Sequence, residues 1–394
     1  MGRALEGIRV LDFTWLVAGP YATRILADFG AEVIKVQTRK MAKGIEADTS
    51  SYFNMWNRNK LGIALDMSHP KGRELAYELV KISDVVIANF TPRVLENWDF
   101  TYETLARLKP TLVMTCMSGM GQTGPWRDYA ALGHTIQALC GFTYLTSPDE
   151  KSPTGIGTAY SDILAGLYTA LVTLAALEFR TKTGKGQFID LSEYEASCTV
   201  LGPALLDYAV NGHCAIPQGN AAPHLPAAPY GSYPCLGEDR WCVIAVFSEE
   251  QWQALCQAMD NPTWVRQKRF SSIPERQRNG EELDNFISRW TVQNAAEHVM
   301  RLLQESGVPC SVVNTAQDLA IDPQLSSRGF FQRFSHPLLG TMVIDSTPIR
   351  LSRTPAQSWQ AAPLLGQDNR YVYQHLLGLS EQDFQRYIAE GIIS

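Results

Sequence analysis

The sequence predicts an α/β protein that combines a large domain built on a parallel sheet with a smaller α+β domain. In the first half of the chain, short apolar strands alternate with helices, which is the pattern of repeated βαβ units. The chain has 394 residues, more than one average domain needs, so two domains are expected. After residue 213 the pattern changes to a hairpin followed by helices, which indicates a second domain of another type.

The elements of the first half follow one another in a regular order. An apolar strand at 8–13 turns at Ala18-Gly19-Pro20 into a helix, since proline is tolerated in a first helical turn. Further strands are predicted at 31–36, 61–67, 85–88 and 111–116. Helices are predicted at 70–81, 92–98 and 102–108. Ligands of such sheets bind at the carboxyl ends of the strands, so we expect the site there.

The longest predicted helix runs from Asp162 to Arg180, with Thr158 or Ser161 as its cap. Its interior is apolar on most faces, which predicts a buried helix. The free N–H groups and the positive dipole end of the helix would stabilise the Asp162 carboxylate. From the pattern alone, Asp162 is either an ordinary helix-start acid or a functional anion.

The rest of the chain predicts a second domain and a return to the first. Gly184 and Gly186 end the long helix, a strand follows at 187–191, and one helix is predicted at 193–210. A stretch rich in Pro, Ala and His at 214–230 is a linker or a substrate loop. Then come hairpin strands at 231–235 and 241–247, helices at 248–259, 281–289 and 295–305, and a strand at 310–313. Strands at 331–334 and 342–344 and helices at 369–377 and 381–389 are expected to rejoin the first domain. The predicted domain bounds are therefore 1–213, 214–329 and 330–394.

The composition argues against several classes of function. The formal net charge is −6 and the pI is near 5.7, which disfavours nucleic-acid and membrane-surface partners. No apolar run is expected to reach the length that spans a bilayer, and the N-terminus lacks the apolar core of a signal peptide. The eight cysteines have no metal-binding spacing and indicate free thiols, so we expect a cytoplasmic protein without a metal site.

One glycine motif has the residue spacing of a dinucleotide-binding fingerprint but not its sequence context. Gly119, Gly121 and Gly124 have the spacing of a dinucleotide fingerprint. Pro125 and Trp126 follow them, and no amphipathic helix opens there. A dinucleotide site is therefore not predicted.

Basic side chains gather near the predicted strand ends. They are Lys35, Arg39, Lys40, Lys43, Arg58, Lys60 and Arg93. On a net-acidic protein this distribution has two interpretations, a solvated face or a site for a polyanion such as a nucleotide with several phosphates. The pattern leaves both open.

Seven phrases spread along the chain carry a family resemblance. They are GIRVLDFTWLVAGPYAT, DFGAEVIKV, NRNKLGIALDM, SDVVIANFTP, SGMGQTGP, LAALEFRTKTGKGQFIDLS and APLLGQDN. Together they resemble the class III coenzyme A transferase family, from residue 7 to the C-terminal helices. The resemblance implies a Rossmann-like large domain built from both chain ends, a small domain, and two subunits interlocked like chain links.

Asp162 occupies the place of the family's nucleophile, a few residues before LAALEFRTKTGKGQ. The resemblance implies that this carboxylate attacks an acyl-CoA thioester and forms an aspartyl anhydride, then an aspartyl-CoA thioester, before CoA passes to a free carboxylic acid. Coenzyme A and acyl-CoA are then substrates, and no permanently bound cofactor is expected. Succinyl-CoA is the expected donor.

The resemblance also implies a set of coenzyme A contacts. These are Val17 and Ala18 for the pantetheine arm, Arg39 for the adenine and ribose phosphate, Met67, Ser68, Asn89 and Phe90 for the nucleotide, and Arg127 for the diphosphate. A family arginine is replaced here by Asn97. Arg93 is expected to substitute for it.

The substrate side is less defined by the sequence. Trp15 and Leu16 lie at the turn expected to face the substrate. The alternative interpretation of Trp15 is that it packs in the core. The family's oxalate-using members carry a polyglycine loop, and the stretch 217–230 stands in its place, which argues against oxalate. With His213 beside it and His224 in it, this loop indicates an acceptor larger and less polar than oxalate. A similarity to the benzylsuccinate-type transferases of the family implies a branched or aromatic-substituted dicarboxylate as the acceptor.

Two alternatives lie within the same superfamily. An α-methylacyl-CoA racemase would use His134 and Asp162 as opposed acid–base groups, but Thr135 follows His134 where the racemases carry an aspartate. Alternatively, the chain is one subunit of a heteromeric transferase. The expected assembly is accordingly a homodimer or a heterodimer with a related subunit.

Overall fold

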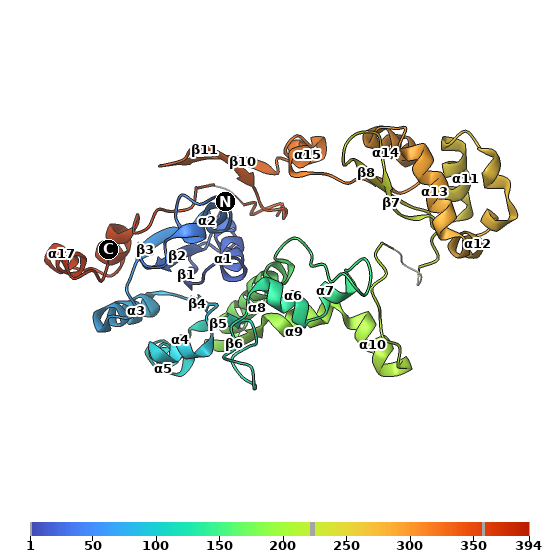
Figure 1. Cartoon of the computed structure of the whole chain (residues 1–394). Coiled ribbons are helices and arrows are strands. Elements are labelled where there is room, and N and C mark those ends of the chain that lie inside the picture. Colours follow the sequence, from blue (N-terminus) through green and yellow to red (C-terminus); the bar gives the residue numbers. More distant parts are fainter. Residues whose placement is uncertain (1, 221–224, 357–358, 394) are drawn as a thin grey trace. The chain divides into compact units, whose positions relative to one another are not determined.

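The computed structural model describes residues 2–220, 225–356 and 359–393, and the chain divides into two compact units. The first unit comprises residues 1–143, 155–215 and 325–394, and the second comprises residues 144–154 and 216–324. Figure 1 colours the chain from the N-terminus to the C-terminus. Both chain ends therefore belong to the first unit.

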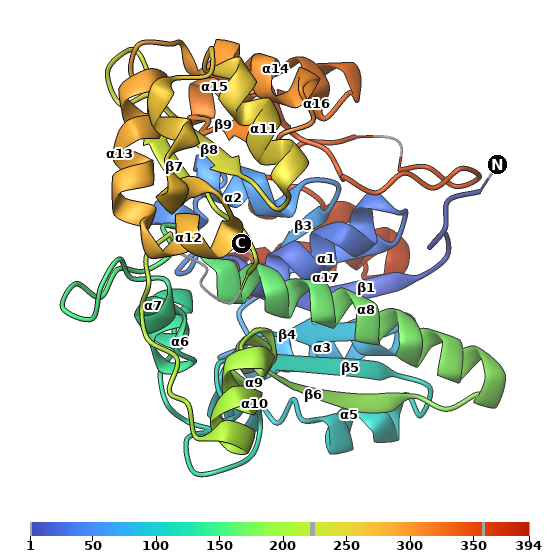
Figure 2. The same ribbon diagram turned by 90° about the vertical axis from the view of Figure 1, so that its right-hand side faces the viewer.

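The first unit is built on a six-stranded parallel sheet (Figure 2) with the order β3-β2-β1-β4-β5-β6. The strands are β1 (Arg9–Phe13), β2 (Glu32–Gln37), β3 (Leu61–Ala64), β4 (Val85–Ala88), β5 (Val113–Ser118) and β6 (Gln187–Ser192). The prediction of an α/β protein with a parallel sheet is confirmed. The strand order reverses between β1 and β4, and ligands of doubly wound sheets bind at such a switch point.

Helices cover both faces of the sheet. On one face lie α1 (Ala18–Asp28) and α8 (Tyr160–Thr183), whose side chains pack with those of the strands in one cluster: Val10, Leu26, Val33, Ile87, Ala176 and Leu177. On the other face lie α3 (Pro70–Ile82), α5 (Tyr102–Leu108), the π-helix η4 (Arg370–Leu376) and α17 (Glu381–Ala389). The larger cluster there includes Leu11, Ile34, Leu79, Leu105, Tyr373 and Phe384.

The remaining elements of the first unit connect these layers. They are η1 (Gly44–Glu46), α2 (Ser51–Asn57), α4 (Pro92–Asn97), α6 (Gly133–Leu139), α7 (Phe142–Leu145, which ends in the second unit), α9 (Glu193–Val200), α10 (Gly202–Asn211), α16 (Pro323–Ser327, which begins in the second unit) and the hairpin β10 (Phe331–His336) to β11 (Gly340–Asp345). The single helix predicted at 193–210 is wrong, because the chain breaks at Leu201 and Pro203 lies in the first turn of a new helix.

The C-terminal segment packs directly onto β3. The Tyr373 hydroxyl donates to the Ala64 carbonyl oxygen at 2.8 Å, and the Gly62 N–H donates to Asp368 at 2.7 Å. A Cβ at Gly62 would lie 2.7 Å from Pro363, so a side chain there would push this segment away. β3 is shorter than predicted and ends at Ala64.

The second unit has its own sheet and core. Its antiparallel strands are β7 (Tyr230–Pro234), β8 (Trp241–Ala245) and β9 (Cys310–Val312), and β8 lies in the middle. Its helices are α11 (Glu249–Ala258), η2 (Thr263–Arg266), η3 (Lys268–Phe270), α12 (Ile273–Arg278), α13 (Gly280–Thr291), α14 (Ala296–Glu305) and α15 (Ala316–Ala320). Tyr233, Ile244, Leu255, Phe270 and Val299 are buried in one cluster.

Helix α8 differs from its prediction as a buried helix. Leu167, Leu171, Leu174 and Phe179 are exposed, with Leu171 at 62%. Over the described residues, α8 is the one helix long and apolar enough to cross a membrane by length and composition, with a mean hydropathy of 1.5, so the expectation that no apolar run reaches this length is wrong. Because α8 also packs against α1 and β5, it is a core helix of the sheet whose outer face is apolar.

Candidate active site

A short turn after β1 forms one wall of the site. The Trp15 N–H donates to the Asn89 side-chain oxygen at 2.9 Å, and the Asn89 amide donates back to the Trp15 carbonyl oxygen at 2.9 Å. The Leu16 N–H donates to Glu46 at 2.8 Å, and Leu16 has a φ of 62°, which is uncommon for a non-glycine residue. These contacts hold the turn at the switch point between β1 and β4.

Buried charges support this turn from the sheet side. Asp12 accepts hydrogen bonds from Thr14 and Thr23, and from the Lys60 ammonium at 3.1 Å, while Lys35 donates to the Thr14 carbonyl oxygen. Burial would raise the pKa of Asp12, but the charges of Lys35 and Lys60 and these hydrogen bonds outweigh it and lower the pKa to about 2. The carboxylate therefore stays ionised under ordinary conditions.

Asp162 lies in the first turn of α8, on the opposite wall. The helix begins at Tyr160 with Ala159 as an uncapped N-terminal residue, so the prediction of a Thr158 or Ser161 cap is wrong. The Asp162 Oδ2 atom is buried and has no hydrogen-bond partner. A Cβ at Gly133 would lie 1.9 Å from this oxygen, so the carboxylate rests directly on the Gly133 backbone.

Close packing of α1 and α8 fixes the distance between the two walls. A Cβ at Gly166 would lie 2.8 Å from the Ala18 carbonyl oxygen, so only glycine allows this approach. Ala18, Met117 and Ala165 form a small buried cluster at the same crossing. Ala165 follows Asp162 by three residues, so the crossing anchors the helical turn that carries the carboxylate.

The surroundings of Asp162 favour its protonated form more strongly than water would. Burial raises the pKa of Asp162 to about 6, against the opposing effects of its own backbone N–H and of the His134 charge. At neutral pH the group is still mostly ionised. A desolvated carboxylate of this kind is a stronger nucleophile than one in water.

A second carboxyl group faces the same space, and the sequence analysis did not single it out. Glu193, the first residue of α9, is 7% exposed, and its Oε1 atom has no hydrogen-bond partner. Burial, and then the charge of Asp162, raise the pKa of Glu193 to about 8. The available signal was an acid placed directly after the last strand of the parallel sheet, where ligands bind.

These groups line one cavity of about 460 Å³. Its lining comprises Trp15, Leu16, Ala18, Asn89, Phe90, Thr91, Val94, Met117, Ser118, Gly119, Tyr129, Ala130, Ala131, Leu132, Gly133, Thr135, Asp162 and Glu193. All belong to the first unit. Among these described residues there is no lysine, arginine or histidine.

Shared residues connect this cavity to two others. A narrow cavity that includes Met67 shares Trp15 and Phe90 with the Asp162 cavity. It also shares Thr38 and Leu65 with a third cavity of about 320 Å³. Arg39, Lys40 and Lys43 line that third cavity, together with Asp66 and the C-terminal Gly391 and Ile392. The row of cavities therefore leads from a cationic end to the Asp162 carboxylate.

The structure brings some of the predicted site residues together and separates others. Trp15, Leu16, Ala18, Asn89, Phe90 and Asp162 line one cavity, while Arg39 and Met67 line the two adjoining cavities. Val17 is buried beside this group. Ser68, Arg93 and His134 are exposed and line none of these cavities, and Arg127 forms ion pairs with Glu96 and Asp128.

Three of the basic residues considered for a polyanion site are engaged elsewhere. Lys35 and Lys60 are buried around Asp12, and Arg58 is fully buried between Asp28 and Asp345, 2.6 Å from the former. Their inclusion in a phosphate site is wrong, because sequence position near strand ends does not distinguish a buried ion pair from a free cation. Arg39, Lys40 and Lys43 remain exposed.

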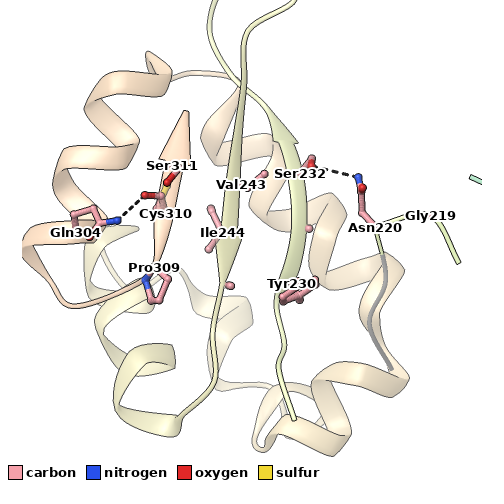
Figure 3. A pocket seen from close by; sticks show the side chains of 12 residues that line it. Gly219, Asn220, Tyr230, Ser232, Val243, Ile244, Gln304, Pro309, Cys310 and Ser311 are labelled. Atoms are coloured by element: carbon pink, nitrogen blue, oxygen red, sulfur yellow. Dashed lines mark hydrogen bonds between the residues drawn. The ribbon is translucent and has the colours of Figure 1, made fainter. Parts of the chain in front are cut away.

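A separate cavity of about 530 Å³ lies on the sheet of the second unit (Figure 3). Gly219 and Asn220, from the predicted substrate loop, line it, and the Asn220 amide donates to Ser232 at 3.2 Å. The described lining side chains include no charged group. His213 is exposed beside Asp207, and His224 lies outside the described residues.

The Gly119-x-Gly121-x-x-Gly124 segment does not form a dinucleotide fingerprint. It follows β5, but the next helix, α6, begins only at Gly133. A fingerprint requires a helix N-terminus directly after the glycines.

Comparisons with known proteins agree with this geometry. Over residues 5–369 the sequence matches the CoA-transferase family III, so the chain belongs to that family. It is 34% identical to the succinyl-CoA–D-citramalate CoA-transferase of Chloroflexus aurantiacus, over 99% of this chain and 98% of that protein. It is 29% identical to the succinyl-CoA:glutarate CoA-transferase of Mus musculus, over 99% and 90% of the two chains. The protein is an enzyme of the CoA-transferase class.

The fold is likewise shared with a solved structure. A CAIB/BAIF family protein from Brucella suis is 29% identical in sequence and has a TM-score of 0.88, over 95% of this chain and 100% of that one. This likeness covers both units described above.

Proposed function

We propose that this protein transfers coenzyme A from an acyl-CoA thioester to a free carboxylic acid, with Asp162 as the nucleophile. One observation carries the proposal: the desolvated Asp162 carboxylate, whose Oδ2 atom has no hydrogen-bond partner, lies at one end of a row of cavities whose other end is cationic. Coenzyme A is elongated, with phosphates at one end and a thiol at the other. Arg39, Lys40 and Lys43 would bind the phosphates, and the thioester would reach Asp162.

The reaction exchanges one activated acyl group for another. An Asp162 oxygen forms a bond to the thioester carbon, the C–S bond breaks, and the electron pair leaves with the CoA thiolate. The thiolate then attacks the aspartyl carbonyl of the anhydride and releases the first acid as its carboxylate. The acceptor carboxylate attacks the aspartyl-CoA thioester, which forms a second anhydride and expels the CoA thiolate. The thiolate then attacks the acyl carbon of the acceptor, the anhydride C–O bond breaks, and the Asp162 carboxylate is released. No oxidant, ATP or proton is consumed in the sum.

Succinyl-CoA is the proposed donor, and a branched dicarboxylate is the proposed acceptor. Two relatives, from Chloroflexus aurantiacus and Mus musculus, are named for succinyl-CoA and for a dicarboxylate as the second substrate. In this chain Trp15, Leu16 and Phe90 give the cavity an apolar wall next to the carboxylate. An acceptor with an apolar branch would bury that branch there.

The racemase alternative would need an acid–base group on each side of the α-carbon. His134 is exposed and is not among the cavity-lining residues, although its charge acts on Asp162. This arrangement supports transfer over racemisation. A racemase would wash deuterium from heavy water into the α position of a 2-methylacyl-CoA without any acceptor acid.

A panel of CoA thioesters and free acids, assayed by mass spectrometry for thioester exchange, tests the proposal. We expect exchange between succinyl-CoA and dicarboxylates, with no deuterium incorporation. Deuteration of a 2-methylacyl-CoA in the absence of any acceptor acid, lost in His134→Gln, would overturn transfer in favour of racemisation. Exchange only after addition of a related second subunit would indicate a heteromeric enzyme.

A further inference from the structure

The Asp162 cavity presents an electrostatic problem for the reaction proposed above. Transfer brings an anionic carboxylate and a CoA thiolate next to the Asp162 carboxylate, yet the described lining side chains include no lysine, arginine or histidine. Two of the neutral donors there are already engaged: the Asn89 amide donates to Trp15, and the Thr135 hydroxyl donates to the Leu132 carbonyl oxygen. An oxyanion forms at the reacting carbonyl, and a hydrogen-bond donor that faces the cavity would stabilise it.

Glu193 is the group placed to supply that donor. Glu193 is 7% exposed, it lines the cavity together with Asp162, and its Oε1 atom has no partner. The two carboxyls come from the first turns of two helices, α8 and α9, that pack against each other. A buried polar atom without a partner is rare and calls for a ligand atom, a water or a proton-sharing neighbour.

We propose that Glu193 is a catalytic residue whose protonated carboxyl group donates a hydrogen bond to the oxyanion formed at the reacting carbonyl. This inference rests on the proposed transferase function. When Asp162 attacks, the carbonyl electron pair moves onto oxygen, and the Glu193 O–H group binds that oxygen without giving up its proton. When the C–S bond breaks and the carbonyl re-forms, the hydrogen bond weakens. The same donor serves each of the four acyl transfers.

The charge state that this role requires agrees with the surroundings of Glu193. Helix α9 packs against α6, α8, α10 and β6, whose titratable side chains include His134, Asp162, Asp207 and Asp190. Only Asp162 among them acts on the pKa of Glu193, which burial and that charge raise to about 8. Burial and the repulsion between the two carboxylates therefore favour a pair that shares one proton, and the raised pKa of Glu193 places that proton on Glu193.

The decisive experiment measures CoA exchange between pH 5 and pH 9.5 in the wild type and three variants. The wild-type rate should rise through about pH 6 as Asp162 ionises and fall through about pH 8 as Glu193 loses its proton. Glu193→Gln keeps a neutral donor, so it should retain activity within about tenfold and lose the fall at high pH. Glu193→Met keeps the size without the donor and should lose about 10²–10³-fold. Glu195→Gln, an exposed acid on the same helix, should follow the wild-type profile.

The outcomes separate this inference from the function on which it rests. Wild-type rates in both Glu193→Gln and Glu193→Met would mean that Glu193 only fills space. An equally large loss in both would mean that its ionised form is needed. Either result overturns the inference, while exchange by the wild type upholds the transferase. Absence of exchange by the wild type defeats the transferase and the catalytic role together. Infrared difference spectra at pH 7 add a readout independent of activity, since a protonated carboxyl band present in the wild type and absent in Glu193→Gln is required.

Discussion

At the scale of single residues, the position of Asp162 depends on the missing side chain of Gly133 and on the missing hydrogen-bond partner of Oδ2. Gly133 has no side chain, and the Asp162 carboxylate occupies the space that a side chain would fill. No hydrogen bond among the described residues holds Oδ2, so steric contact with this backbone, rather than a polar partner, sets its direction. That arrangement leaves the oxygen free to attack, at the cost of sensitivity to one glycine.

Gly133→Ala should therefore impair the reaction without unfolding the protein. Its Cβ would lie 1.9 Å from Oδ2, so the carboxylate must move by about an ångström or more, and a misplacement of that size lowers rates by about a hundredfold. The measurement is kcat for CoA exchange, with circular dichroism as the check on folding. Gly157→Ala is the matched control, because nothing lies within 4 Å of the Cβ it adds. Equal activity in the two variants would contradict this packing.

At the scale of elements, much of the fold follows from sequence pattern. The bounds of β4, α5 and α17 were predicted as they are found, because each has a clear apolar period with a start or stop signal at both ends. The break between α9 and α10 was missed, because Gly202 and Pro203 are compatible with either a first turn or an interruption. Helices α6 and α7 were missed because they are short and packed by tertiary contacts.

The same limit applies to the site. Asp162 was predicted because a family phrase follows it, whereas Glu193 has the pattern of an ordinary acid after a serine cap. Its burial depends on the packing of α6, α8 and α9, which no local pattern encodes. Likewise, the sequence pattern of Lys35 and Lys60 is that of exposed cations near strand ends. Only the packing of the sheet shows that both are buried beside Asp12.

The buried Asp12 group gives a prediction at this scale. Asp12→Asn would leave Lys35 and Lys60 buried without a carboxylate, and removal of one partner of a buried ion pair costs about 3–5 kcal/mol. We expect a loss of that order in the free energy of unfolding, measured in urea. Glu74→Gln breaks an exposed pair with Lys71 and should leave the free energy of unfolding nearly unchanged. A difference below about 1 kcal/mol between the variants would show that the buried group adds no stability.

At the scale of the whole molecule, the first unit leaves an unusual amount of apolar surface uncovered. Leu171 of α8 is 62% exposed, and on α10 Leu206 is 64% and Val210 is 70% exposed. Large apolar side chains exposed on helices can mark a protein interface when they gather in one patch. We propose that a second copy of the chain covers it and that the two copies are interlocked.

An interlocked dimer should resist dilution. Separation of linked chains requires unfolding, so mass action alone should not dissociate them, unlike an ordinary dimer. Light scattering from micromolar concentrations down to the detection limit should give twice the mass of 43.8 kDa throughout. Leu206→Glu should lower the yield of folded protein rather than produce a folded monomer. A stable monomer at micromolar concentration would contradict the proposal.

The central claim is that Asp162 becomes covalently bound to the substrate. Its most direct test is mass spectrometry of the peptide containing residue 162 after brief incubation with succinyl-CoA and acid quenching. We expect a mass increase on Asp162 that corresponds to an acyl group or to coenzyme A. In Asp162→Asn this adduct should be absent, and exchange should fall below about one per cent of the wild-type rate, more than 2.7 kcal/mol of barrier. Exchange above that level in folded Asp162→Asn, or a wild type that turns over without any adduct on this peptide, would contradict the account.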